Sequence, residues 1–351
     1  MSAESYRDDI GNRTGLTRLG ERNACDPEPR WQRQLSEAVR ELGELERLLD
    51  LPAGSLASDT VTAVEFPLLV PRAFVARMQK RDPTDPLLRQ VLPTAAEGHP
   101  AAGFVADPLG ELGLTRDGSI SKYPGRVLLI TTGACPLHCR YCFRREFPYS
   151  RETAARNEWR AAVATIRNTP HVHEVILSGG DPLSLSNERL ARLIAELETI
   201  PGLETLRIHT RFPIALPARV DRGLVELLSA TRLNTVVVVH TNHPAEIDDA
   251  VRTAANELKN CSSYLLNQSV LLRGVNDSAD TLIELSKTLL SAGILPYYVH
   301  LLDRVSGAAH FEVDADEGAE IVATMRRRAP GYLIPSLVRD TFGELSKTPI
   351  A

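Results

Sequence analysis

From about residue 127 onward, the apolar residues of the chain fall into short β-branched runs separated by longer amphipathic stretches. Bounded by turn residues, such runs predict β-strands, here over residues 127–131, 174–179, 205–210, 235–241, 264–271 and 295–301. The stretches between them, such as 187–200 and 245–260, place apolar residues at helical spacing. Most runs begin about 30 residues apart, which is enough for one strand, one helix and two short loops. The pattern is therefore a βα repeat.

Six consecutive βα units predict an α/β fold, a partial (β/α)6 barrel of the TIM type. Runs that are apolar along their whole length, such as 236–239, are typical of parallel strands covered on both faces. In such barrels the chemistry lies at the carboxyl ends of the strands, where the loops converge. Polar and reactive residues do follow the predicted strands, at positions 135–142, 178–181, 209–211, 240–243, 268 and 303.

Before residue 127 the pattern changes to helices joined by proline-bearing connections. Residues 31–49 give the clearest helix, and residues 82–92 are one such connection. We therefore expect an N-terminal helical extension over residues 1–115, the barrel over 116–340 and a C-terminal tail over 341–351. The first 25 or so residues are polar, which favours disorder.

Composition and charge narrow the range of partners. The chain has 351 residues with 40 Lys and Arg against 45 Asp and Glu, so its net charge of −5 gives no electrostatic case for binding nucleic acid. No apolar run approaches the roughly 18 residues of a membrane span. The polar N-terminus also lacks the apolar core of a signal peptide. We expect a cytoplasmic protein that binds neither membranes nor nucleic acid.

Three of the five cysteines lie within eight residues, directly after the first predicted strand. Cys135, Cys139 and Cys142 form a C-x3-C-x2-C array, and three thiolates around an iron–sulfur cluster leave one iron open to an exogenous ligand. One alternative is a zinc site with His138 as the fourth ligand. A structural zinc usually joins two separated ligand pairs, however, so the cluster is the favoured interpretation. The other alternative is three unrelated buried cysteines.

The array, placed after the first strand of a six-fold βα repeat, resembles the radical S-adenosylmethionine (SAM) superfamily. From about Asp107 to Pro349, the chain further resembles the lysine 2,3-aminomutase family, and along nearly its whole length it resembles the members of that family that supply β-lysine for elongation factor P. The segments that carry this resemblance are YPGRVLLI at 123–130, CFRR at 142–145, LSGGDP at 177–182, NQSVLLRGVND at 267–277, PYY at 296–298 and SKTP at 346–349.

This resemblance implies three cofactors: a [4Fe-4S] cluster on the three cysteines, SAM, and pyridoxal 5′-phosphate (PLP). It makes Lys347 the lysine that holds PLP covalently, and a neutral amine is needed to attack the PLP aldehyde. The run before Lys347 has one glycine, whereas that of the family is glycine-rich, so the path of the tail stays open. The other PLP contacts implied are Arg126, Tyr123 and His300, and the SAM contacts implied are Ser178, Gly179, Gly180, Asp181, Gln268 and His240.

For the substrate, Arg144 matches the arginine of the family that binds the α-carboxylate through two parallel hydrogen bonds. Asp303 and Asp340 match the two aspartates that receive the side-chain ammonium of lysine. Two converging carboxylates need a cation between them, which favours lysine over glutamate as substrate. The resemblance also implies that there is no zinc. The longer catabolic members of the family carry a zinc site made from one mid-chain cysteine and several C-terminal cysteines, whereas here residues 276–278, at the mid-chain place, contain no cysteine and the sequence ends at residue 351.

The expected reaction is the conversion of (S)-α-lysine to (R)-β-lysine by a lysine 2,3-aminomutase. Alternatives are a radical SAM aminomutase acting on another amino acid, a radical SAM enzyme that modifies a macromolecule without PLP, and a zinc-stabilised binding protein. The expected partners are L-lysine and an electron donor such as flavodoxin or ferredoxin. Whether the chain forms a homo-oligomer is left open.

Overall fold

The computed structural model describes residues 30–56, 66–155 and 158–351. These residues form a ten-stranded sheet whose strands lie in chain order from β1 to β10. Seven neighbouring strands are parallel: β3 (Arg126–Thr132), β4 (Glu174–Gly179), β5 (Thr205–Thr210), β6 (Asn234–His240), β7 (Tyr264–Val270), β8 (Leu295–His300) and β9 (Ser336–Arg339). The six predicted strands are confirmed, and β9 is an additional parallel strand that the repeat did not predict.

Short antiparallel strands complete both edges of the sheet. β1 (Thr115–Arg116) pairs with β2 (Ser119–Tyr123), β2 pairs with β3, and β10 (Thr348–Pro349) pairs with β9. Among the strands described, β1 and β10 do not pair with each other, so the sheet stays open. The predicted fold class, a partial TIM-like α/β barrel, is confirmed.

The register of the parallel strands brings polar residues together at one rim. Ser178 of β4 lies opposite Ile130 of β3, and His240 of β6 lies opposite Gln268 of β7. His300 of β8 lies opposite Val270 of β7. Because all seven strands point the same way, the loops that follow them converge at this rim.

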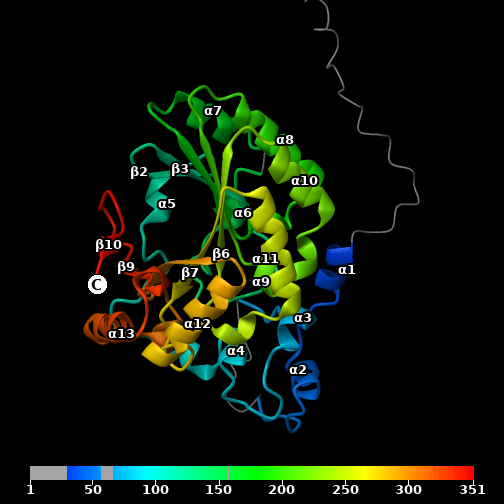
Figure 1. Cartoon of the computed structure of the whole chain (residues 1–351), viewed down its shortest axis with the longest axis vertical. Helices are drawn as coiled ribbons and strands as arrows, with labels where there is room; N and C mark the ends of the chain where they lie inside the picture. The colour runs from blue at the N-terminus through cyan, green and yellow to red at the C-terminus, as the bar shows by residue number, and fades with distance from the viewer. Residues whose placement is uncertain (1–29, 57–65, 156–157) are drawn as a thin grey trace, which may run out of the picture.

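Amphipathic helices cover the outer face of the sheet (Figure 1). They are α7 (Arg160–Asn168), α8 (Asn187–Glu198), α10 (Arg222–Ala230), α11 (Asp249–Cys261), α12 (Ala279–Ser291) and α13 (Ala315–Arg328). All but α7 begin at a side-chain cap that accepts a backbone N–H of the first turn, which fixes where they start. These caps are Ser186, Asp221, Asp248, Ser278 and Asp314. The main hydrophobic core lies between these helices and the strands, and Leu129, Leu177 and Leu190 in it are fully buried.

Several short elements connect the strands and helices. They are α6 (Tyr149–Glu152), α9 (Phe212–Ala215), and the 3-10 turns η2 (Pro182–Ser184), η3 (Pro217–Arg219), η4 (Pro244–Glu246), η5 (Ala309–Phe311) and η6 (Gly331–Leu333). Of these, η2, α9 and η4 lie in the loops that follow β4, β5 and β6.

The N-terminal part contains α1 (Arg30–Ser36), α2 (Leu42–Leu48), α3 (Arg72–Val75), α4 (Pro86–Arg89), η1 (Ala95–Gly98) and α5 (Glu111–Leu114). The single helix predicted over residues 31–49 is wrong, because Val39 interrupts it. The amide of Val39 donates to the carbonyl of Val70 at 2.8 Å and Val70 donates back at 3.0 Å, so a tertiary β-bridge replaces the helical bonds. The predicted disorder of residues 1–25 lies outside the described residues.

A second hydrophobic cluster joins this extension to the barrel. It includes Leu45, Phe74 and Leu87 of the extension, all fully buried, together with Leu137 of the cysteine loop and Ala215 of α9. The extension therefore packs directly on the loop that carries the three cysteines.

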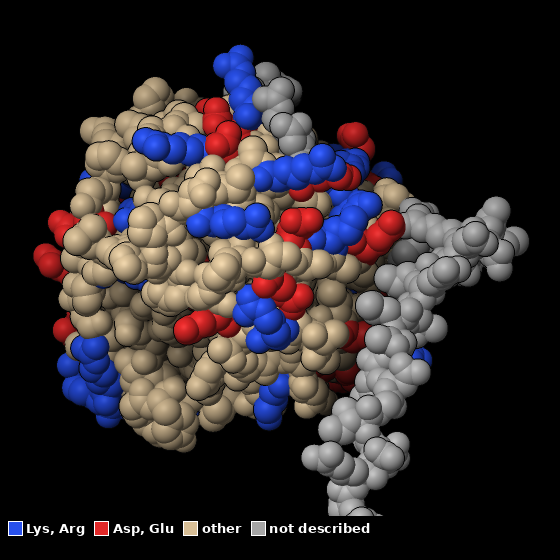
Figure 2. All heavy atoms as spheres, turned by 90° about the horizontal axis from the view of Figure 1, so that it is seen from above, with Lys and Arg blue, Asp and Glu red and all other residues tan. Residues whose placement is uncertain are grey.

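The surface carries charges of both signs. On the face seen in Figure 2, the Lys and Arg side chains are interspersed with Asp and Glu, and neither sign forms a continuous patch. In the described part of the chain, no helix has the length and apolar character needed to cross a membrane.

Candidate active site

A cavity of about 340 Å³ opens at the carboxyl-terminal rim of the parallel strands. All sixteen site residues predicted from the sequence line it: Cys135, Cys139, Cys142, Tyr123, Arg126, Arg144, Ser178, Gly179, Gly180, Asp181, His240, Gln268, His300, Asp303, Asp340 and Lys347. They come from strands and loops spread over more than 200 residues of sequence. The structure thus places every predicted residue in one space, while their individual roles remain predictions.

The cysteine loop follows β3 and is held by the N-terminal extension. The amide of His138 donates to the carbonyl of Leu69 at 3.0 Å, and the amide of Arg140 donates to the carbonyl of Gln90 at 2.9 Å. The fully buried Arg140 side chain also donates from Nε to Oε1 of Glu97 at 2.8 Å. Two regions far apart in sequence therefore build the loop together.

The donor set of this loop suits an iron–sulfur cluster. Cys135, Cys139 and Cys142 are all free thiols, and burial raises the pKa of each, that of Cys142 to about 11. Buried thiolates need a cationic centre to stay ionised, which a metal cluster supplies. Within the described residues, no set of three His, Cys, Asp or Glu side chains is arranged to hold a single metal ion. His138 is the fourth ligand in the zinc alternative, and its Nδ1 atom lies 2.8 Å from the carbonyl oxygen of Pro67.

The glycine turn after β4 lies against the cysteine loop. Gly179 has a φ of +114°, and a Cβ on Gly180 would lie 2.4 Å from the carbonyl oxygen of Ala134. Only glycine permits this close approach of the two backbones. As a result, Ser178 to Gly180 line the cavity beside the cysteines, where the sequence predicts SAM.

Asp181 has a different environment, because its carboxylate is already occupied. It accepts hydrogen bonds from the amide of Arg211 at 2.6 Å and from Oγ1 of Thr210 at 2.8 Å, and also from the amides of Leu183 and Phe212. Burial raises its pKa to about 6 in spite of these bonds. Its side chain thus joins the loops after β4 and β5.

Neutral histidines line the wall of the cavity. Burial lowers the pKa of His209, His240 and His300, that of His240 to about 3. Nε2 of His240 lies 3.0 Å from Nε2 of Gln268. The Nε2 atoms of His209 and His300 are buried and have no hydrogen-bond partner among the described residues. Such unpaired polar atoms fit a cavity that receives polar ligands, as the predicted cofactors are.

The C-terminal tail returns to the rim through β10. Pairing of Thr348 with Arg339 brings Nζ of Lys347 to 2.6 Å from Oδ2 of Asp340. Nζ of Lys122 and the hydroxyl of Tyr123, at 2.7 Å, also donate to Asp340. Burial alone would raise the pKa of Asp340, but the two lysines and the tyrosine outweigh it and hold this pKa well below its usual range. The path of the tail, left open by the sequence, therefore passes the cavity at Ser346 and Lys347 and then pairs with β9 as strand β10.

The other predicted ammonium ligand, Asp303, is in a less favourable electrostatic position. Burial and then the negative charge of Asp340 raise its pKa to about 7. A cation placed between the two carboxylates would reverse this effect. This region of the cavity is thus suited to an incoming ammonium group.

Arg144 has a partner that the sequence did not indicate. Its Nε and Nη2 atoms donate to the carboxylate of Glu111 at 2.6 and 2.8 Å, and Nη1 donates to Oγ of Ser178 at 2.9 Å. Burial would lower the pKa of Arg144, but Glu111 outweighs this and raises it. Glu111 itself sits in α5, where its amide is held by Asp107. Lys122, the neighbour of Tyr123, is another site residue that was missed, and no family segment included it.

Comparisons with known proteins show which sequences the chain as a whole is similar to. A sequence model of the radical SAM superfamily matches residues 129–285. A protein of Escherichia coli K12 named L-lysine 2,3-aminomutase is 44% identical over 91% of this chain and 94% of its own length. Proteins of the same name from Haemophilus influenzae and Clostridium subterminale are 42% and 35% identical, over 92% and 91% of this chain and 95% and 77% of their own lengths.

Proposed function

The chain belongs to the L-lysine 2,3-aminomutase family of radical SAM enzymes, and from this premise we propose that its cavity moves the α-amino group of L-lysine to the β-carbon. It is an isomerase that works with a [4Fe-4S] cluster, SAM and PLP. The observation that carries the site assignment is the meeting of three thiols, Lys347 and two aspartates in one cavity.

When bound, the cluster and SAM supply a radical that takes a hydrogen from lysine, and PLP supplies the conjugated system that carries the migrating nitrogen. Cys135, Cys139 and Cys142 would hold the cluster, and Ser178 to Gly180 would contact SAM beside it. Lys347 would hold PLP through its amine. For the PLP phosphate, Arg126 offers a guanidinium that stacks over the Tyr123 ring, 5.0 Å from its centroid.

The two aspartates would select the substrate side chain. Asp340 is ionised and forms ion pairs with Lys122 and Lys347. Asp303 has a raised pKa, in part because it is close to the negative charge of Asp340. An ammonium group relieves the repulsion between the two carboxylates, whereas a side-chain carboxylate increases it. The aspartate pair therefore favours lysine over glutamate as substrate.

Arg144 would bind the α-carboxylate of the substrate. Its Nε and Nη2 atoms are already engaged by Glu111, so the substrate would approach from the Nη1 side, where Ser178 now accepts. Glu111 would then act as a positioning residue that fixes the plane of the guanidinium.

The proposed product is (R)-β-lysine for the modification of elongation factor P. Support comes from the segments named above, which resemble the members of the family that supply β-lysine for elongation factor P. This role requires a cytoplasmic protein and an external one-electron donor, such as flavodoxin or ferredoxin.

The test is anaerobic reconstitution with iron, sulfide, SAM, PLP and a chemical reductant, with lysine, glutamate and arginine offered as separate substrates. Chiral chromatography should find (R)-β-lysine from lysine and no β-amino acid from the other two. Product from glutamate or arginine at a similar rate would contradict the role of the aspartate pair. A fully reconstituted protein that forms no β-lysine would contradict the proposed reaction itself.

A further inference from the structure

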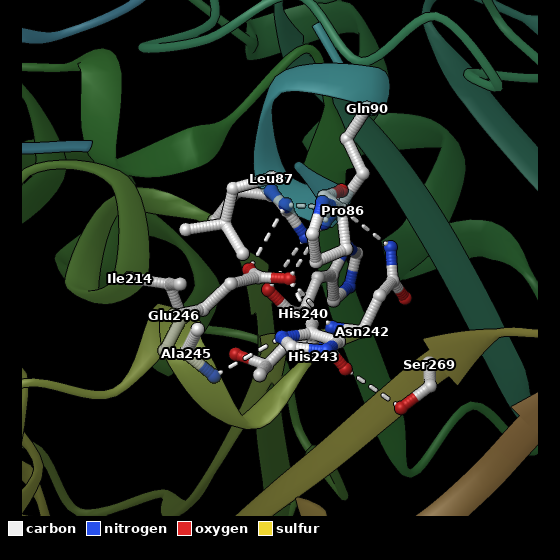
Figure 3. Close-up of polar contacts among 12 residues, drawn as sticks. Pro86, Leu87, Gln90, Ile214, His240, Asn242, His243, Ala245, Glu246 and Ser269 are labelled. Carbon is white, nitrogen blue, oxygen red and sulfur yellow. Dashed lines mark hydrogen bonds and ion pairs between the residues drawn. The ribbon is translucent and has the colours of Figure 1, made fainter. Parts of the chain in front are cut away.

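A buried polar network lies behind the cysteine loop, and Gln90 is its centre. Gln90 follows α4 of the N-terminal extension and is completely buried. Figure 3 shows its side chain converging with those of Glu246 and Asn242, which follow β6. Its Nε2 atom donates to Oε1 of Glu246 at 3.0 Å, and its Oε1 atom accepts from Nδ2 of Asn242 at 2.9 Å.

The network contains a buried ion pair. Nη2 of Arg211, which follows β5, lies 3.0 Å from Oε2 of Glu246 and donates to Oε1 of Gln90 at 2.9 Å. Nη1 of Arg211 donates to the carbonyl of His240 at 2.9 Å. Glu246 also accepts from the backbone amides of Asn242 and His243 at 3.0 and 3.1 Å. Arg211 is therefore held at both terminal nitrogens, and Glu246 accepts its hydrogen bonds at Oε1. The Oε2 atom of Glu246 is buried and has no hydrogen-bond partner among the described residues, so its contact with Arg211 is an ion pair only.

This network reaches the cysteine loop at two points. The carbonyl of Gln90 accepts from the amide of Arg140, which directly follows Cys139. The hydroxyl of Tyr141, one residue before Cys142, donates to Oε1 of Gln90 at 3.3 Å and accepts from Nδ2 of Asn242 at 2.7 Å.

Arg211 also belongs to the cavity that the cysteines line. Its Nε atom is buried and has no hydrogen-bond partner in the described part of the chain. The cation of the pair is thus on the cavity side, while the carboxylate of Glu246 is completely buried and is not part of the cavity lining.

Charge and hydrogen bonds close to an iron–sulfur cluster set its reduction potential. The reduced cluster carries one more negative charge than the oxidised cluster. A nearby cation therefore stabilises the reduced cluster, and a nearby anion destabilises it. We propose that the Arg211–Glu246 pair, tied by Gln90 to the cysteine loop, sets the reduction potential of the cluster held there. The proposal rests on the assignment of the three cysteines as cluster ligands.

In the redox step concerned, the cluster takes one electron from an external low-potential donor. No bond of the network forms or breaks, and no proton moves. Arg211, Glu246 and Gln90 are therefore positioning and electrostatic residues, distinct from the groups that contact the substrate.

The test compares Arg211→Gln and Glu246→Gln in the full chain, reconstituted anaerobically without SAM. Loss of the cation should make the cluster harder to reduce, and loss of the anion should make it easier. Each change should alter the one-electron reduction equilibrium by roughly tenfold, equal to about 59 mV, in opposite directions. The midpoint is read from a redox titration followed by electron paramagnetic resonance, with iron and sulfide counted in every sample.

Arg219→Gln is the matched control. Arg219 is also a fully buried arginine, paired with Asp221 at 3.8 Å, but it does not line the cavity. Its variant should keep the wild-type midpoint.

Opposite shifts in the two test variants would support the proposal, because a general loosening of the loop has no reason to change sign. If one test variant loses its cluster, the midpoint potential of the remaining variant decides. A shift in the stated direction supports the proposal, and a wild-type value overturns it. Equal midpoints, or shifts of the same sign, also overturn it. Loss of the cluster from both test variants, with a complete cluster in the Arg219→Gln variant, would overturn the proposal, because the network would then serve to hold the loop and not to set the potential. A wild-type protein that binds no cluster would instead refute the proposed function.

Discussion

The raised pKa of Asp303 predicts that lysine binding depends on pH. An ammonium group binds the ionised carboxylate, and burial together with the charge of Asp340 raises the pKa of Asp303 to about 7. The ionised fraction then falls from about nine-tenths at pH 8 to about one-tenth at pH 6. The affinity for the lysine side chain should therefore fall about tenfold over this range. Asp340 adds no dependence there, because its own pKa is well below its usual range.

Norleucine gives the internal control, since it has the same carbon chain as lysine but no side-chain amine. Between pH 6 and pH 8 the α-amino groups of both amino acids stay almost fully protonated and their α-carboxylates stay ionised, so the change in the ratio of the two dissociation constants isolates the side-chain contact. Both constants are measured anaerobically from the PLP absorbance of loaded protein without SAM, so that no turnover occurs. The ratio should favour lysine about tenfold less at pH 6 than at pH 8, and Asp303→Asn should make it independent of pH. A constant ratio in the wild-type protein would refute the argument.

Three further predictions test other parts of the site. Cys139→Ala should abolish iron binding and activity, and retention of a full complement of iron and acid-labile sulfide would contradict its role as ligand. Lys347→Ala should keep the cluster but lose the absorbance of bound PLP, whereas turnover at the wild-type rate would exclude it as the PLP lysine. Glu97→Gln should lower the free energy of unfolding by about 3 kcal/mol, measured by urea denaturation of the cluster-free protein, because Glu97 pairs with the buried Arg140 and Arg145. An unchanged midpoint would show that these pairs do not stabilise the loop.

The sequence predicted the elements whose signal is local. Parallel strands such as β6 (Asn234–His240) contain a continuous apolar run, here residues 236–239, and the strands repeat at a nearly constant interval, so the barrel could be predicted without knowing any tertiary contact. The helix over residues 31–49 was wrong because the bond from Val39 to Val70 is formed by residues 31 positions apart. Local propensity carries no information about such a bond.

The same distinction holds for the site. Residues in recognisable segments, such as Lys347, were predicted, and the structure brings them to the cavity. The partners that orient them were not predicted, because in the sequence Glu111 and Gln90 look like any other polar residues of the N-terminal extension. Their roles become visible only when the fold places them beside Arg144 and Arg211.

These partners change how the N-terminal extension is understood. The predicted boundary at residue 115 separates two sequence patterns, but the polar contacts cross it. Three polar residues before the boundary bind the cysteine loop. Gln90 accepts a hydrogen bond from the backbone of Arg140, and Glu97 pairs with the side chains of Arg140 and Arg145. Glu111 pairs with the side chain of Arg144. Each of these arginines lies within three residues of a cysteine of the array. Since an arginine buried without its carboxylate costs several kcal/mol, the cysteine loop depends on the extension for its native conformation. The extension and the barrel therefore form one site.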